Sequence, residues 1–250
     1  MGTAAKLADT VRRAAGRNPT PRVSAILVAA GSSTRMGTAV SKQFLEVGGI
    51  PVLARTMMTF ESSPLIGEII VVARKEDMIE VGALATKHHI TKLAAVIEGG
   101  DTRALSVRKG FSRVGARFPF VAIHDGARCL VTPEIIEGVC RAAYRHKAAT
   151  AACRVSDTVK LANSKGFIES TVNRDKVFLA TTPQVFDVNL YRGALETVKD
   201  FEHLTDDNQL IESLPFAVKL VECDRTNIKI TEPSDIRYAE FILGERERKV

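Results

Sequence analysis

The stretch LVAAGSSTRMG, residues 27–37, begins as a short apolar run and continues as small side chains that end near one arginine. If the apolar run is a buried strand, Gly31 and the two serines after it leave backbone N–H groups open to an anion. Arg35 and, further along, Lys42 add positive charge that suits a triphosphate. The stretch matches neither G-x-x-x-x-G-K-[ST] nor G-x-G-x-x-G, the usual signatures of P-loop enzymes and of dinucleotide binding. The alternative is a turn of small residues that only packs a helix tightly against the strand.

Short apolar runs rich in branched residues recur along the chain and alternate with amphipathic segments. Such runs are typical of strands buried on both faces, and we predict strands at 23–30, 68–73, 93–98, 120–125, 150–155 and 217–222. Helices are predicted to begin at Pro51 and at Thr132-Pro133, each with apolar residues on one face. The pattern predicts an α/β fold with a mostly parallel sheet flanked by helices, in which ligands bind at the carboxyl ends of the strands.

The chain carries a net charge of +6, and much of this charge lies close to its beginning. Residues 1–22 contain five arginine or lysine residues and one aspartate, and we interpret them as an N-terminal extension. Residues 23–250 are then a single domain, and hydrophobic residues make up 45% of the chain, enough for a core. Because this domain has little excess charge, we do not expect a nucleic-acid partner.

The cellular location and the state of the cysteines follow from what the sequence lacks. No apolar run is long enough to span a membrane, and residues 1–22 lack the apolar middle of a secretory signal. We therefore expect a cytoplasmic protein without a membrane partner. The cysteines are widely spaced and show no metal-binding pattern, so we interpret them as reduced thiols that mostly fill the core: Cys129, Cys140, Cys153 and Cys223.

A second loop with polar residues follows the predicted strand at 93–98. It consists of two glycines and three polar side chains, Gly99, Gly100, Asp101, Arg103 and Ser106. The glycines allow a flat ligand to come close to the backbone, and the polar side chains offer hydrogen bonds. A plain glycine turn followed by a helix that Thr102 caps explains the same residues equally well.

A third loop follows the predicted strand at 120–125, which ends at Asp125. Magnesium bound to a nucleotide takes few protein carboxylates and keeps phosphate and water oxygens as its other ligands. We therefore interpret Asp125 as a Mg²⁺ ligand. The neighbouring His124 is interpreted as a core histidine, because no second histidine stands at a metal-binding spacing.

Eight segments of the chain together resemble one enzyme family. The sequence is similar to the 2-C-methyl-D-erythritol 4-phosphate cytidylyltransferases of the non-mevalonate isoprenoid pathway in AAGSSTRMG, SKQFLEVGGIPVL, GGDTRALSV, HDGAR, SDTVK, TVNRDKVFLATTPQVF, TDD and NIKITEPSD, which occur in the expected order. The resemblance extends from about Val23 to Leu243. It is specific as an ensemble, although many sugar nucleotidyltransferases share the first segment. It implies a Rossmann-like nucleotidyltransferase sheet that transfers CMP from CTP to the sugar-alcohol phosphate and releases pyrophosphate.

The resemblance also implies roles for individual residues. It implies a catalytic role for Arg35, Lys42 and Lys229. It implies contacts with the nucleotide for Ala29, Ala30, Gly31, Gly100, Asp101, Ser106 and Ala127. It implies contacts with the sugar phosphate for Arg128, Thr158, Arg174, Thr182 and Thr205, and a magnesium-associated position for Asp125. No catalytic histidine is needed, because a phosphomonoester is already mostly dianionic at neutral pH.

Residues 156–176 contain two alternating stretches joined by the turn NSKG, which predicts a hairpin too polar for the central sheet. The resemblance implies that this hairpin is an arm that reaches over the partner subunit of a homodimer. The alternative is a solvated flap that closes over its own chain.

Three positions depart from the family pattern. Cys129 and Arg154 stand where proline is usual, and Asn208 stands where a small residue is common. The first two changes are expected to alter loop rigidity and the geometry of the arm. None of the three removes a charged group that we assign to chemistry.

Two other functions remain open at this stage. A cytidylyltransferase for a pentitol phosphate such as ribitol 5-phosphate would use the same triphosphate site and differ mainly in the sugar pocket. A non-catalytic nucleotide-binding or nucleic-acid-binding protein belongs to another class, and the presence of Lys42, Asp125 and Lys229 argues against it.

Overall fold

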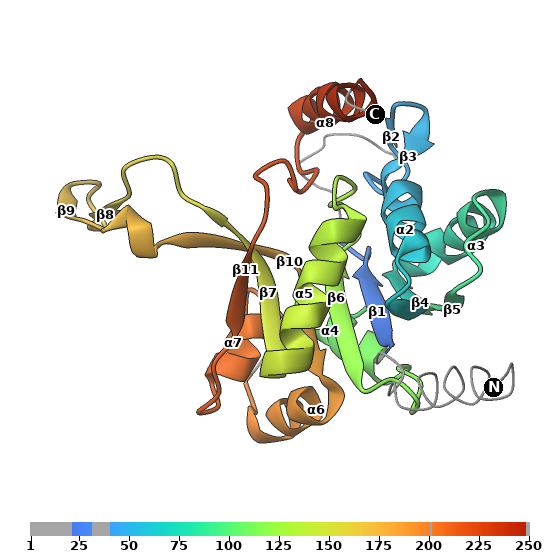
Figure 1. Cartoon of the computed structure of the whole chain (residues 1–250), viewed down its shortest axis with the longest axis horizontal. Helices are drawn as coiled ribbons and strands as arrows, with labels where there is room; N and C mark the ends of the chain where they lie inside the picture. The colour runs from blue at the N-terminus through green and yellow to red at the C-terminus, as the bar shows by residue number, and fades with distance from the viewer. Residues whose placement is uncertain (1–21, 32–40, 201, 249–250) are drawn as a thin grey trace, which may run out of the picture.

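The computed structural model describes residues 22–31, 41–200 and 202–248. Its centre is a seven-stranded sheet (Figure 1) made of β1 (Val23–Val28), β4 (Ile66–Ala73), β5 (Leu93–Glu98), β6 (Phe120–Asp125), β7 (Ala148–Arg154), β10 (Phe178–Asp187) and β11 (Lys219–Glu222). The strands lie in the order β11-β7-β10-β6-β1-β4-β5. The apolar runs of the sequence therefore form one continuous sheet.

All strands of this sheet run in one direction except β10, which pairs antiparallel with both β6 and β7. The predicted, mostly parallel α/β sheet is therefore confirmed. Strand β1 lies between β4 and β6, so the chain leaves β1 toward one edge of the sheet and later returns to its other side. Ligands bind at such a reversal, outside the carboxyl ends of the strands.

The predicted strands differ in how deeply they lie in the sheet. Strands β1, β4, β6 and β7 are buried along nearly their whole length. The expectation of burial on both faces is wrong for β5, which is mostly half-buried, and for β11, which is mostly exposed. These two strands are the edges of the sheet, so each has a neighbour on one side only.

Helices cover both faces of the sheet. They are α2 (Val52–Ser62), α3 (Met78–Lys87), α4 (Arg103–Phe111), α5 (Pro133–His146), α6 (Val188–Thr197), α7 (Asp207–Glu212) and α8 (Pro233–Glu247), with short 3₁₀ turns at Lys75–Asp77 and Arg174–Lys176. One core layer joins the sheet to α2, α3 and α5, and a second joins it to α4, α6 and α7. The predicted starts at Pro51 and Thr132-Pro133 are confirmed, and the Thr132 side chain caps α5 by accepting from the Ile135 N–H.

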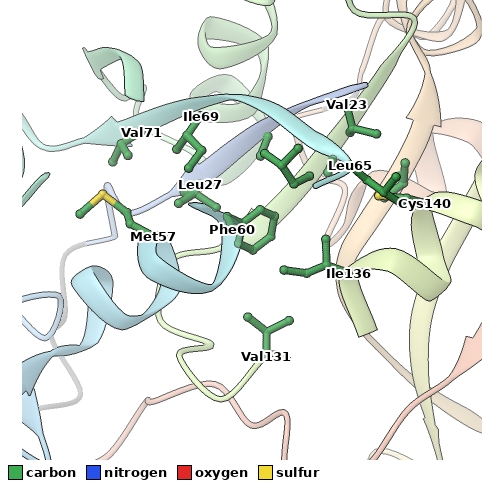
Figure 2. Close-up of a cluster of buried hydrophobic side chains, with 14 of the residues drawn as sticks. Val23, Leu27, Met57, Phe60, Leu65, Ile69, Val71, Val131, Ile136 and Cys140 are labelled. Atoms are coloured by element: carbon green, nitrogen blue, oxygen red, sulfur yellow. The ribbon is translucent and has the colours of Figure 1, made fainter. Parts of the chain in front are cut away.

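The first core layer is centred on Phe60 of α2, which is fully buried. Figure 2 shows its ring among Leu27 of β1, Ile136 of α5 and Leu65, which directly precedes β4. The opposite layer receives Ile26 of β1, because alternate side chains of a strand point to opposite faces. This packing fixes β1 and β6 side by side, and with them the loops at their carboxyl ends.

A smaller apolar cluster lies beyond those carboxyl ends. It joins α8 and the hairpin of β2 (Glu46–Val47) and β3 (Ile50–Pro51) to the loop after β6, and Figure 1 shows α8 beside this hairpin. Cys129 is buried in the cluster, and burial raises the pKa of its thiol to about 11. Cys129, which stands where the family usually has proline, therefore makes apolar contacts in this cluster.

The predicted hairpin is confirmed as β8 (Lys160–Ala162) and β9 (Ile168–Thr171), which project from the body of the molecule as an arm (Figure 1). Its turn contains Gly166 with φ of 82°, a left-handed conformation that favours glycine. The Asn163 side chain accepts hydrogen bonds from two backbone N–H groups across the turn. At the root of the arm, Arg154 pairs with Glu222 at 2.9 Å and lies over the Phe178 ring.

None of the described helices has the length and the apolar character that a membrane span requires.

Candidate functional site

A cavity of about 300 Å³ opens at the carboxyl ends of β1 and β6, where the strand order reverses. Its lining comes from the loops after β1, β5 and β6, from the segment before β2 and from the segment before α8. Nine of the residues for which the resemblance implies a role line it: Ala30, Gly31, Lys42, Gly100, Asp101, Ser106, Asp125, Ala127 and Lys229. Ala29 is buried beside them and does not line the cavity.

Asp125, the last residue of β6, is surrounded by positive charge. Its Oδ2 lies 3.0 Å from Lys229 Nζ and 3.4 Å from Arg128 Nε, and its Oδ1 lies 3.4 Å from Arg103 Nε. Burial alone would raise the pKa of Asp125, but Lys229, Arg103 and Arg128 outweigh it and hold the pKa well below its usual range. Asp125 is therefore ionised, and it gathers three cations around it, of which Lys229 and Arg103 line the cavity and Arg128 does not.

Arg103 at the start of α4 joins this cluster to a second buried carboxylate. Its Nη1 donates to Asp207 Oδ2 at 2.7 Å, and the Tyr191 hydroxyl donates to Asp207 Oδ1 at 2.6 Å. Burial would lower the pKa of Arg103, but Asp207 and Asp125 together raise it above its ordinary value. The Arg103 guanidinium thus pairs with two carboxylates, Asp125 at the end of β6 and Asp207 at the start of α7.

Sequence reasoning treated Arg103 only as a polar side chain of a glycine loop and missed Asp207 and Tyr191. The signal for Asp207 was present in the TDD segment, where two acidic residues stand together. Nothing in the sequence pairs that segment with Arg103, which lies 104 positions away. Only the folded chain shows the contact.

The glycine loop after β5 packs against its surroundings with no room for side chains. A Cβ on Gly99 would lie 2.5 Å from the Cβ of Ala30, and one on Gly100 would lie 2.6 Å from the Cβ of Leu105. The Gly100 N–H donates to Ser106 Oγ at 3.0 Å. Thr102 also caps α4, as the alternative interpretation held, so the loop both caps a helix and lines the cavity.

Lys42 also lines the cavity, from the segment between β1 and β2. It is 8% exposed, and its Nζ donates to the Ile230 carbonyl oxygen at 3.1 Å. The Ile230 N–H in turn donates to the Ala127 carbonyl oxygen at 2.8 Å. These bonds tie the segments that carry Lys42 and Lys229 to the loop after β6. Cations from three distant segments thus line one cavity, an arrangement that suits a polyanion.

Thr182 lies behind the cavity and acts through Asp125. Its Oγ1 accepts from the Asp125 N–H at 3.1 Å and lies 3.0 Å from His124 Nδ1. His124 is fully buried, which lowers its pKa to about 3, so the prediction of a core histidine is confirmed. The Thr182 carbonyl oxygen accepts from the Asn227 side chain at 2.9 Å. This network fixes the end of β6.

Three residues with expected roles at the sugar phosphate lie away from the cavity in this chain. Thr158 and Arg174 are exposed on the arm, where Arg174 Nη1 donates to the Ser156 carbonyl oxygen at 2.8 Å. Thr205 is exposed before α7, and its N–H donates to the Gln209 side chain. None of them is among the lining residues in the described part of the chain. Arg35 lies outside the described residues.

The donor set suits magnesium only when the ion arrives with a phosphate ligand. Within residues 22–31, 41–200 and 202–248, no group of three or more His, Cys, Asp or Glu side chains could hold a metal ion. Two described residues of the lining carry a carboxylate, the exposed Asp101 and the buried Asp125, and magnesium on a nucleotide needs only one or two. The residues present therefore fit Mg²⁺ bound together with a nucleotide.

Comparison with known proteins shows the family to which the chain belongs. The family model for 2-C-methyl-D-erythritol 4-phosphate cytidylyltransferase matches residues 23–245. The chain belongs to this family. It is a cytidylyltransferase, one of the nucleotidyltransferases, and its α/β sheet is the fold of that family.

Relatives and solved structures match the chain along most of its length. The 2-C-methyl-D-erythritol 4-phosphate cytidylyltransferase of Caldanaerobacter subterraneus is 43% identical over 88% of this chain and 98% of the relative. That of Syntrophus aciditrophicus is 39% identical over 92% of this chain and 99% of the relative. The crystal structure of 4-diphosphocytidyl-2C-methyl-D-erythritol synthase from Anaerococcus prevotii has a TM-score of 0.79 at 33% identity, covering 90% and 99% of the two chains.

Arg103→Met should destabilise this cytidylyltransferase strongly, because it leaves the buried Asp207 without its cation. Breaking a buried ion pair costs about 3 kcal/mol or more, and Asp207 is 5% exposed. The free energy of unfolding in urea measures the loss. Arg141→Met is the matched control, since Arg141 pairs with Glu137 on the exposed face of α5, where such pairs contribute about 0–1 kcal/mol. Equal losses in the two variants would contradict the assigned role of Arg103.

Proposed function

We propose that the cavity at the end of β6 binds CTP and that the chain transfers CMP to 2-C-methyl-D-erythritol 4-phosphate. Pyrophosphate leaves, and 4-diphosphocytidyl-2-C-methyl-D-erythritol is formed for isoprenoid precursor synthesis. The observation that supports this site most strongly is the ionised Asp125 with Lys229, Arg103 and Arg128 around it, at the strand ends where the order reverses. The relatives with this printed name match the whole region that builds the cavity.

The reaction needs no general base from the protein. The attacking phosphomonoester has a second pKa near 6, as such groups do, so it is mostly dianionic at neutral pH. The histidine nearest to the cavity, His124, is buried, and its ring nitrogens lie against Thr182 and the Arg128 carbonyl oxygen. It is therefore occupied in holding the end of β6. The protein must instead bring two polyanions together and stabilise the in-line transition state at the α-phosphorus.

We assign the triphosphate to the side of the cavity formed by the loop after β1. Backbone groups of Ala29, Ala30 and Gly31, the charge of Lys42 and, outside the described residues, Arg35 would hold it. The loop after β5 would take the cytosine and the ribose, with the backbone of Gly100 and the side chains of Asp101 and Ser106. Support comes from their common lining of one cavity, Ala29 and Arg35 excepted. Ala127, two residues after Asp125, also lines the cavity.

Lys229 is the group that we place beside the reacting phosphorus. Its ammonium lies 3.0 Å from Asp125 and reaches the cavity from the segment before α8. Asp125 orients this ammonium and neutralises part of its charge until the substrates enter. Together with Lys42 and Arg35, Lys229 would stabilise the charge on the transferring phosphoryl group. Arg128, which Asp125 also holds, would meet the sugar phosphate.

Magnesium is the cofactor that this reaction calls for, with Asp125 as its protein ligand. When bound, the ion neutralises phosphate charge and polarises the bonds at the α-phosphorus. Asp125 has a lowered pKa and is ionised throughout the physiological range, so it offers its oxygens without first losing a proton. Lys229 and Arg128, which contact Asp125, would bind the substrate phosphates.

The arm completes the active site of a partner subunit in a homodimer. Leu161, Phe167 and Ile168 are large apolar side chains exposed on the arm, with 53%, 69% and 66% of their surface open. An isolated hairpin of this size is marginal in water, so such side chains need a surface to pack on. The same arm carries Thr158 and Arg174, which lie away from the cavity of their own chain. Crossing to the partner would bring them to its sugar phosphate, for which the resemblance also implies contacts with Thr182 and Thr205.

The test of this function is pyrophosphate release from CTP in the presence of a panel of sugar-alcohol phosphates. We expect turnover with 2-C-methyl-D-erythritol 4-phosphate well above that with ribitol 5-phosphate. Preference for the pentitol phosphate would move the chain to the other substrate, and no pyrophosphate release with any acceptor would remove the proposed reaction.

Lys42→Ala should reduce turnover by roughly 10²-fold or more, as the loss of other transition-state donors does. The rate of pyrophosphate release at saturating substrates measures this effect, and circular dichroism checks the fold. Lys87→Ala, on the exposed end of α3, is the control and should keep the native rate. A correctly folded Lys42→Ala chain with a near-native rate would exclude Lys42 from the mechanism.

Asp125→Asn should raise the concentration of Mg²⁺ needed for half-maximal turnover and lower the turnover itself, because the amide keeps the shape without the charge. Asp77→Asn is the matched control: Asp77 is also buried and also paired with an arginine, Arg74 at 2.8 Å, far from the cavity. A second measurement uses the native chain, in which chelation of Mg²⁺ should abolish turnover. Full activity of the native chain in excess chelator would refute the metal assignment.

If the arm crosses to the partner, chains with Lys42→Ala and chains with Arg174→Ala should complement each other. A mixed dimer then holds one site with both residues intact, and random pairing of an equal mixture gives roughly a quarter of the native activity. Each variant refolded alone is the baseline, and Lys165→Ala at the tip of the arm is the charge-loss control. Mixed dimers that are confirmed by mass but show no gain would place Arg174 on its own chain or outside the mechanism.

A further inference from the structure

Two thiols lie in contact at the root of the arm, outside the residues assigned to the reaction. Cys153 is the penultimate residue of β7, and Cys223 directly follows β11. Their sulfur atoms lie 3.5 Å apart, within hydrogen-bond distance of each other. Both cysteines are free thiols in the structure.

The backbone already holds these cysteines at the spacing that a disulfide requires. Ala152 and Glu222 are register partners in the parallel pair of β7 and β11, so the two cysteines stand side by side one position later. The Cys223 N–H donates to the Ala152 carbonyl oxygen at 2.9 Å, which extends the pairing to this point. Neighbouring strands lie about 4.8 Å apart, within the Cα separation of about 4.4–6.8 Å that disulfides span. Closure needs the sulfurs to approach by about 1.5 Å, to a bond length of about 2.05 Å.

The two thiols differ in their access to a reagent. Cys153 is buried, and burial together with the neighbouring Cys223 raises the pKa of its thiol above the ordinary value. Cys223 is half exposed, so it is the thiol that a reagent in solution meets first. This is the arrangement of an attacking thiol with a buried resolving thiol behind it.

We propose that Cys153 and Cys223 form a reversible dithiol–disulfide site that small-molecule disulfides oxidise. We further propose that the disulfide, once formed, restrains the loop that leads to Lys229. The Cys223 sulfur attacks one sulfur of the disulfide reagent, and one thiol of the reagent leaves with a proton. The Cys153 sulfur then attacks the mixed disulfide, and the second reagent thiol leaves with the other proton. The protein loses two hydrogen atoms as its dithiol is oxidised, and the reagent is reduced to two thiols.

The restraint follows from what surrounds the sulfurs. Cys153 Sγ donates to the Asp224 carbonyl oxygen at 3.4 Å, and closure removes this bond. The next residue, Arg225, donates to Ser156 Oγ at the beginning of the arm. The same loop continues to Lys229, which contacts Asp125. A covalent link at Cys223 therefore acts at once on the root of the arm and on the segment that carries the ammonium group of the site.

The whole reduced chain, treated with oxidised glutathione, tests the proposal by intact mass and by peptide mapping without reductant. We expect the loss of the mass of two hydrogen atoms and a linked peptide that joins Cys153 to Cys223, both reversed by dithiothreitol. A glutathione adduct that persists on Cys223, or no modification of the pair, overturns the proposal.

Single variants separate the two steps of closure. Cys153→Ser keeps the accessible thiol and lacks the resolving one, so a glutathione adduct should accumulate on Cys223. Cys223→Ser should leave the buried Cys153 unmodified. Cys140→Ala is the matched control, because Cys140 is a buried cysteine of α5 outside the pair, and its oxidation should equal that of the native chain. If a serine variant does not fold, the linked peptide of the native chain decides the matter by itself.

The effect on turnover rests on the proposed function and is measured separately from disulfide formation. Misplacing a reacting group by about 1 Å can cost roughly 10²-fold, and we expect closure to lower pyrophosphate release on the order of tenfold, with recovery in dithiothreitol. A reduced chain without activity would count against the proposed function alone. An active chain whose rate is unchanged after complete closure overturns the restraint on Lys229.

Discussion

The charge of one buried carboxylate organises the site. Burial acting alone would raise the pKa of Asp125, yet Lys229, Arg103 and Arg128 keep it ionised, and it in turn keeps three cations together. Without that negative charge, the cations would repel one another at the base of a cavity built for an anion. The cluster is therefore stable before any substrate arrives, and the substrate phosphates can replace Asp125 as partners of the cations. Catalysis by such a site comes from charges that are already in position.

The fold supplies the geometry that this carboxylate needs. Asp125 ends a strand whose backbone is fixed on both sides, by β1 and by β10, and its own N–H bonds Thr182 of β10. The cations come from separate elements: the start of α4, the loop after β6 and the segment before α8. Apolar layers on both faces of the sheet hold those elements in place. The positions of the charges are thus a consequence of core packing around β1 and β6.

Local sequence signals predicted the parts of this architecture that depend on local chemistry. Apolar runs predicted strands of the sheet, and Thr132 with Pro133 predicted the start of α5. The polar end of a buried run singled out Asp125 as a candidate site residue. Strand β10 was not predicted, because its threonines and Pro183 hide the apolar pattern and its neighbours are decided by tertiary packing. The contact of Arg103 with Asp207 was missed for a related reason, since no periodicity connects residues so far apart in the chain. The same holds for the neighbouring thiols of β7 and β11.

The ionisation of Asp125 can be followed directly, from the carboxyl carbon resonance of the labelled side chain as the pH is lowered. We expect Asp125 to stay ionised at pH values where an ordinary aspartate, with a pKa of about 3.9, is largely protonated. We also expect Lys229→Met to raise the pKa of Asp125, because the closest cation is lost. Titration of Asp125 near the ordinary value in the native chain, with no change in Lys229→Met, would contradict the central role of this buried charge.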